Sequence, residues 1–74
     1  MAKLKNIFEQ RRENAMQIKN TKDRNNELSK ISQLRRLCKT ATELDYDDEV
    51  IYKIANAKSV IQAENILKDA RLAS

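Results

Sequence analysis

The sequence predicts an all-α fold, a small bundle of three to four helices that forms a single helical domain over residues 1–74. It contains no glycine and no proline, the residues that most readily supply the special φ angles of hairpin turns. Good helix formers dominate, with eight Ala, seven Leu and nine Lys against two Val. We therefore expect helices at about 3–19, 26–43, 48–57 and 60–72, and no sheet.

The first expected helix, residues 3–19, has an apolar stripe about 100° wide, the width of a core-facing surface. The stripe consists of Leu4, Ile7, Phe8, Ala15 and Ile18. Arg11 projects from its middle, so either its stem covers apolar surface below a solvated guanidinium or it pairs with a carboxylate of another helix. We favour the pairing, because the stripe continues on both sides of Arg11.

Residues 20–26 contain no large apolar residue and are expected to connect the first two helices. Asp23 or Asn25 could cap the helix that follows. Apolar residues then recur at helical spacing from Leu28 onward, which predicts the second helix at 26–43. Cys38 lies in this stripe, and we interpret it as a small core residue rather than as a nucleophile.

An acidic run follows the second helix and contains Asp45, Asp47, Asp48 and Glu49. Asp45 or Asp47 is a suitable N-cap for the third helix, and carboxylates in a first turn interact favourably with the helix dipole. The run lacks the glycine and the spaced carboxylates of an EF-hand loop, so we expect no metal site there.

The last 25 residues have apolar side chains on two opposed faces. One face holds Val50, Ile51, Ile54, Ala57 and Ile61, and the other holds Val60, Ala63, Ile66, Leu67 and Ala70. Ser59 followed by Gln62 fits a capping box, so we expect a break between helices at 48–57 and 60–72. The alternative is one long helix whose second half turns its other face to a partner subunit.

Positive charge is concentrated in the first part of the chain. Residues 1–40 hold 11 Lys+Arg and 4 Asp+Glu, and residues 41–74 hold 4 and 7, which gives charges of +7 and −3. Either the basic half faces an anionic partner or the two halves neutralise each other in the monomer. The densest cations are Arg35, Arg36 and Lys39, and a second basic ridge, which by default is a solvated face, contains Lys5, Arg12 and Lys19.

Residues 31–72 contain the segment from Val50 to Ala55 followed by Val60, Ala63, Ile66 and Leu67. With this pattern they resemble ubiquitin-associated-type three-helix domains. The resemblance implies a three-helix shape but not ubiquitin binding, because Glu43-Leu44-Asp45-Tyr46 stands where that family has a Met-Gly-Phe-type motif.

A second pattern consists of Ala15-Met16, Lys19, Asp23-Arg24, Leu34-Arg35 and Asp47-Asp48-Glu49-Val50. It resembles the helical domain of the GatB/YqeY family, which is associated with tRNA-dependent amidation. Lys, Asn and Ile together make up 23 of the 74 residues, a composition similar to small proteins of A/T-rich bacteria and of T-even-type phages. Small regulators of such phages include cytoplasmic lysis-inhibition factors.

These features predict a non-catalytic, cytoplasmic binding protein that regulates or inhibits a larger protein by occupying its surface, as a phage-encoded lysis-inhibition factor would. With no histidine and one cysteine, the chain lacks the usual triads and Cys/His zinc sets, and we expect no cofactor. A homo-oligomer is expected because a domain of this size has only a thin hydrophobic core to stabilise it. The candidate partner-binding residues are Arg35, Arg36, Lys39, Arg12, Lys19, Phe8, Tyr46 and Tyr52.

The alternative function is binding of RNA or DNA through a basic helix face, where Lys and Arg would contact phosphates. Contact of the first helix with a membrane surface ranks last, because its apolar stripe is short and Arg11 interrupts it. No apolar run in the sequence is long enough to cross a membrane.

Overall fold

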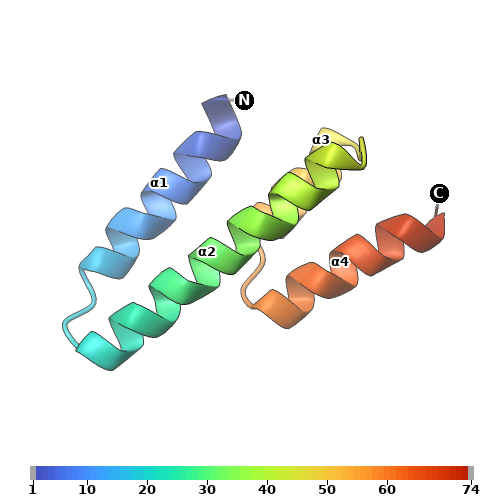
Figure 1. The fold of residues 1–74 in the computed structure, drawn as a ribbon. Helices are drawn as coiled ribbons and strands as arrows, with labels where there is room; N and C mark the ends of the chain where they lie inside the picture. Colours follow the sequence, from blue (N-terminus) through green and yellow to red (C-terminus); the bar gives the residue numbers. More distant parts are fainter. Residues whose placement is uncertain (1, 74) are drawn as a thin grey trace.

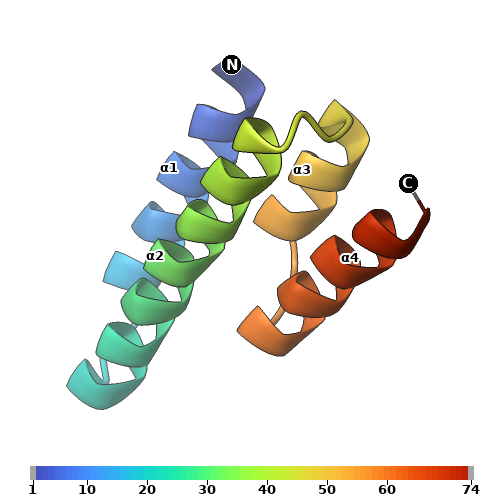
Figure 2. The same ribbon diagram turned by 45° about the vertical axis from the view of Figure 1, so that its right-hand side comes forward.

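The computed structural model describes the backbone of residues 2–73 and the side chains of residues 4–72. It contains α1 (Ala2–Met16), α2 (Thr21–Glu43), α3 (Asp48–Ala55) and α4 (Val60–Ala73) (Figure 1). Successive helices run antiparallel, and α1 and α4 lie on opposite sides of the pair formed by α2 and α3 (Figures 1 and 2). The prediction of a small all-α bundle is confirmed.

The hydrophobic core lies where α1, α2 and α3 meet. Helix α2 contributes Leu34 and Cys38, and α3 contributes Ile51 and Ile54, the four largest side chains that are almost fully buried. Burial of one such aliphatic side chain stabilises the fold by about 1.5–3 kcal/mol. Phe8 and Ala15 complete the core from α1, whereas among the side chains described in α4 only Ala63 belongs to the buried set.

The connection between α1 and α2 is shorter than expected. Helix α1 ends at Met16 rather than at residue 19, and α2 begins at Thr21 rather than at residue 26. The side chain of Asn20 caps α2 by accepting a 3.1 Å hydrogen bond from the backbone N–H of Asp23. The prediction that Asp23 or Asn25 forms this cap is wrong. Because Asn20 caps α2, the polar residues 21–26 are helical although they contribute little to the core.

A Schellman motif ends α2. The N–H of Tyr46 donates to the carbonyl of Ala41 and the N–H of Asp45 donates to that of Thr42, both at 3.1 Å. Asp45 has φ 64°, the left-handed conformation that glycine most often supplies at this position. Asp47 is the N-cap residue of α3, as one of the two predictions had it, but its side chain makes no capping hydrogen bond.

The predicted break between α3 and α4 is confirmed. The hydroxyl of Ser59 accepts a hydrogen bond from the N–H of Gln62 at 3.1 Å, and the side-chain oxygen of Gln62 accepts one from the N–H of Lys58 at 2.9 Å. The second bond reaches one residue further back than in a standard capping box. Helix α3 ends at Ala55, two residues before the expected end.

Arg11 joins three helices. Its guanidinium lies 3.8 Å from a carboxylate oxygen of Glu27, which confirms the predicted pairing with another helix. The same group donates hydrogen bonds of 2.7 and 2.8 Å to the carbonyls of Ala55 and Ala57, at and just beyond the end of α3. A side chain of α1 thus satisfies backbone acceptors that the end of α3 leaves without helical partners.

Candidate partner-binding groove between helices α1 and α2

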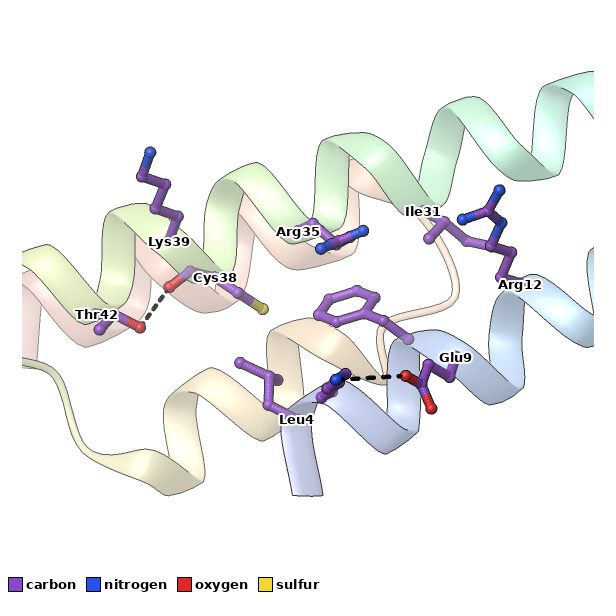
Figure 3. A pocket seen from close by; sticks show the side chains of 10 residues that line it. Leu4, Glu9, Arg12, Ile31, Arg35, Cys38, Lys39 and Thr42 are labelled. Atoms are coloured by element: carbon purple, nitrogen blue, oxygen red, sulfur yellow. Dashed lines mark hydrogen bonds and ion pairs between the residues drawn. The ribbon is translucent and has the colours of Figure 1, made fainter. Parts of the chain in front are cut away.

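A groove of about 450 Å³ runs between α1 and α2 (Figure 3). We call it the basic groove, and its walls consist of Leu4, Lys5, Phe8, Glu9 and Arg12 from α1 and of Ile31, Arg35, Cys38, Lys39 and Thr42 from α2. The two helices are antiparallel, so the start of α1 and the last turns of α2 form one end of the groove. Leu4 and Thr42 lie at that end, and longer cationic side chains line the rest of the groove.

The floor of the groove is apolar. Phe8 is 8% exposed and Ile31 is 5% exposed, so both belong to the core but reach the groove at their edges. Leu4 is partly buried beside them. A partner side chain in this groove would therefore meet hydrocarbon rather than buried polar groups.

Cys38 also lies at the floor, and the structure confirms that it is a core residue. Its thiol donates to the carbonyl of Ile51 across an Sγ···O distance of 3.5 Å. Desolvation by burial raises the pKa of this thiol from 9.0 to about 11. At neutral pH the sulfur is protonated, so the environment of Cys38 is the opposite of the one that activates a nucleophilic cysteine.

The rim of the groove is cationic. The guanidinium of Arg35 lies 5.8 Å from the ring centroid of Phe8, in range of a cation–π interaction, and extends over the groove in Figure 3. Lys5 is 4.0 Å from the carboxylate of Glu9, and both side chains are well exposed. Among the side chains of residues 4–70, Arg12 and Lys39 have no carboxylate partner. Four cations therefore surround the groove with a single acid among them.

The structure gathers half of the candidate residues predicted from the sequence. Phe8, Arg12, Arg35 and Lys39 meet at the basic groove. Phe8 lies in the core rather than standing as an exposed anchor, because its ring packs between the two helices below Arg35.

The other candidates lie elsewhere. Arg36 and Lys19 are exposed and do not line the groove. Tyr46 and Tyr52 are half-buried on the α2–α3 turn and on α3. Leu4, Glu9 and Thr42 line the groove but were not sequence candidates, because only the pairing of α1 with α2 places them on one surface.

The ion pairs among residues 4–70 lie within the two oppositely charged halves of the chain and not between them. Within residues 4–70, Lys5 pairs with Glu9, and Glu27 with both Arg11 and Lys30, all in the first half. Lys53 pairs with Glu49 in the second half. No ion pair in this range joins the halves, so the basic groove keeps its charge in the folded monomer.

The described residues lack the features of two other kinds of site. Their side chains contain no group of three or more His, Cys, Asp or Glu that could hold a metal ion. Within the same part of the chain, no helix combines the length and the apolar character that crossing a bilayer requires.

Comparison with known proteins gives no match, whether to a family model, to a curated protein or to a solved structure.

Proposed function

We propose that this chain is a non-catalytic binding protein that regulates a larger protein by holding an acidic, amphipathic segment of it in the basic groove. The observation that supports this most directly is an apolar floor bordered by four cations and only one acid. Apolar contact would supply affinity, and the cations would select acidic segments and exclude basic ones.

The size of the groove suits a short helix. Its walls extend along α1 from Leu4 to Arg12 and along α2 from Ile31 to Thr42. At about 1.5 Å per residue these stretches are about 12 and 16 Å long, which matches two to three turns of a partner helix. Such a helix would add to the α1–α2 pair in the manner of a bundle and cover Phe8 and Ile31.

The expected mechanism is steric. A surface of the partner that lies in the groove is unavailable to its other ligands, and no bond is made or broken. Because the rim charges are exposed, salt should weaken this binding through screening. The apolar floor should retain part of the affinity at high salt.

Capture of partners from the cell of origin tests this function. The bait is compared with a groove variant, Arg12→Glu, Arg35→Glu and Lys39→Glu, and with a charge-matched control, Lys19→Glu, Lys22→Glu and Arg36→Glu. We expect the control to retain the partner and the groove variant to lose it, with helicity by circular dichroism unchanged in both. Equal capture by the two variants would contradict the groove as the binding site.

Nucleic acid is the second candidate, and the exposed Arg36 favours it because it extends the positive surface around α2. Base stacking has little support, since the ring of Phe8 is buried below Arg35 and both tyrosines lie outside the groove. Mobility of labelled single- and double-stranded RNA and DNA at low salt decides between the two candidates. A shift that the groove variant abolishes would favour nucleic acid.

A further inference from the structure

The α2–α3 turn bears negative charge that the monomer leaves unneutralised. We call this region the acidic corner, and define it by Glu43, Asp45, Asp47 and Asp48, all of which are exposed. Within residues 4–70 none of these four carboxylates forms an ion pair or a side-chain hydrogen bond. Asp48 benefits from the N-terminus of α3, but Glu43 stands at the C-terminal end of α2, where the helix dipole disfavours an acid.

The acidic corner also has an apolar side chain. Leu44 lies between Glu43 and Asp45 and is 51% exposed, whereas the neighbouring Tyr46 packs partly against the core. An exposed leucine flanked by carboxylates has the chemistry that the basic groove would accept, an apolar group for the floor and acids for the rim.

The basic groove and the acidic corner adjoin at one end of the molecule. Thr42 lines the groove, and Glu43, the first residue of the corner, directly follows it. The start of α1 and the α2–α3 turn lie at the same end of the bundle in both ribbon views (Figures 1 and 2). Complementary surfaces that adjoin in this way can meet their counterparts on a second molecule about a two-fold axis.

We propose that two copies of this chain pair reciprocally, each placing its acidic corner in the basic groove of the other with Leu44 on the apolar floor. A second copy is favoured as occupant because the chain itself carries both complementary surfaces and leaves both unneutralised. The two contacts are equivalent, so the pair closes and does not extend into a filament.

The pairing uses the groove of the proposed function but does not depend on a partner protein. It would regulate that function, because a groove filled by a second copy is closed to any other acidic segment. A standard interface buries about 800 Å² on each partner, which is a small part of the 5584 Å² of accessible surface of this chain. The surface is therefore large enough for such a pairing. Exposed ion pairs each contribute little, so we expect a salt-sensitive dimer with a dissociation constant in the micromolar range.

Sedimentation equilibrium of the whole chain, from about 5 to 500 µM and at about 0.05 and 0.5 M salt, tests the pairing. We expect a dimer at the lower salt and a dissociation constant at least about fivefold larger at the higher salt. A monomer at every concentration, a salt-insensitive dimer or growth beyond a dimer would overturn the proposal.

Charge exchange gives a second test. The groove-reversed variant is Arg35→Glu with Lys39→Glu, and the corner-reversed variant is Glu43→Lys, Asp47→Lys and Asp48→Lys, which leaves Asp45 as the one acid of the corner. Each alone should dimerise at least about tenfold more weakly, because groove and corner then have charges of the same sign. In an equimolar mixture both contacts become complementary again, so a one-to-one heterodimer should form.

The matched control for the groove-reversed variant is Lys22→Glu with Arg36→Glu, which changes the net charge by the same amount but outside the groove and should leave dimerisation within about twofold of wild type. Restoration in the mixture cannot result from unfolding, and the salt series needs no variant. A mixture that stays monomeric would overturn the reciprocal contact, whereas the partner-capture result with the triple groove variant would still decide the proposed function separately.

Discussion

Helices α3 and α4 follow each other in the chain but contribute very differently to the fold. Helix α3 has 8 residues and buries Ile51, Ile54 and Ala55. Helix α4 has 14 residues and buries only Ala63 among its described side chains, while Ile61 and Leu72 are 72% and 77% exposed. Within the described chain α3 contacts all three other helices, whereas α4 contacts only α2 and α3. The position of a helix in the core, rather than its length, therefore decides how much stability it contributes.

The largest expected effect compares one isoleucine from each of these helices. Ile54→Ala removes a fully buried side chain and leaves a cavity, so it should lower the free energy of unfolding by about 2–5 kcal/mol. Ile61→Ala changes an exposed residue and should move this free energy by no more than about 0.5 kcal/mol. Urea unfolding followed by circular dichroism measures both. Similar losses of unfolding free energy for the two variants would contradict the exposure of Ile61 and show that it is packed as tightly as Ile54.

Arg11 tests how α1 stabilises the end of α3. Arg11→Ala removes the donor of two charge-assisted hydrogen bonds to the carbonyls of Ala55 and Ala57, and should cost about 2–4 kcal/mol of unfolding free energy. The neighbouring Arg12→Ala is the control and should cost no more than about 0.5 kcal/mol, because Arg12 is exposed. If both variants have the Tm of wild type in thermal melts, the hydrogen bonds of Arg11 do not stabilise the end of α3.

The pH dependence of stability tests how deeply Cys38 is buried between α2 and α3. Since its pKa is raised to about 11 in the folded chain from 9.0, the folded state holds its proton more tightly than the unfolded state. The stabilisation from the buried neutral thiol is thus complete below about pH 9 and is lost as pH rises toward 11, to a total of about 2–3 kcal/mol. Thermal melts of wild type should show this loss relative to Cys38→Ala. A parallel pH dependence in the two proteins would indicate that the thiol ionises freely.

The smallest effect is expected at the entry to α3. Asp45→Gly relieves the cost of φ 64° for a residue with a Cβ and should stabilise the fold by about 0.5–1 kcal/mol. Asp47→Gly is the contrast, because φ at Asp47 is −59° and a glycine there adds only unfolded-state freedom. Differential scanning calorimetry should therefore show opposite shifts of Tm. A lower Tm for Asp45→Gly would mean that the carboxylate itself stabilises the turn.

The break between α3 and α4 could be predicted from the sequence, whereas the end of α1 and the start of α2 could not. Opposed apolar faces and the Ser59–Gln62 pattern located the α3–α4 break, since a straight helix could not bury both faces. Apolar periodicity failed at the start of α2, where Thr21 to Asn26 are helical but contribute little to the core. It also extended α1 too far, because Ile18 packs against the core from the turn that follows the helix.

The basic groove was predictable only in part, because it depends on how α1 pairs with α2. Helical periodicity identified Arg35 and Lys39 as surface cations, but it could not show that they lie opposite Arg12 across a groove. That relation depends on the antiparallel register of α1 against α2, which the ion pair of Arg11 with Glu27 helps to fix. The separation of Arg36 from this surface, although it is adjacent to Arg35 in sequence, follows from the turn of the helix.

The long sequence separation of the Arg11 contacts has a kinetic consequence. Its acceptors, the carbonyls of Ala55 and Ala57, are in place only after α3 has formed and docked beside α1. We expect these polar bonds to form after the main barrier to folding, once apolar contacts have brought α1 and α3 together. A group of this kind slows the escape from the native state and leaves the speed of refolding almost unchanged, so the lifetime of the native protein, rather than its rate of appearance, should depend on one guanidinium.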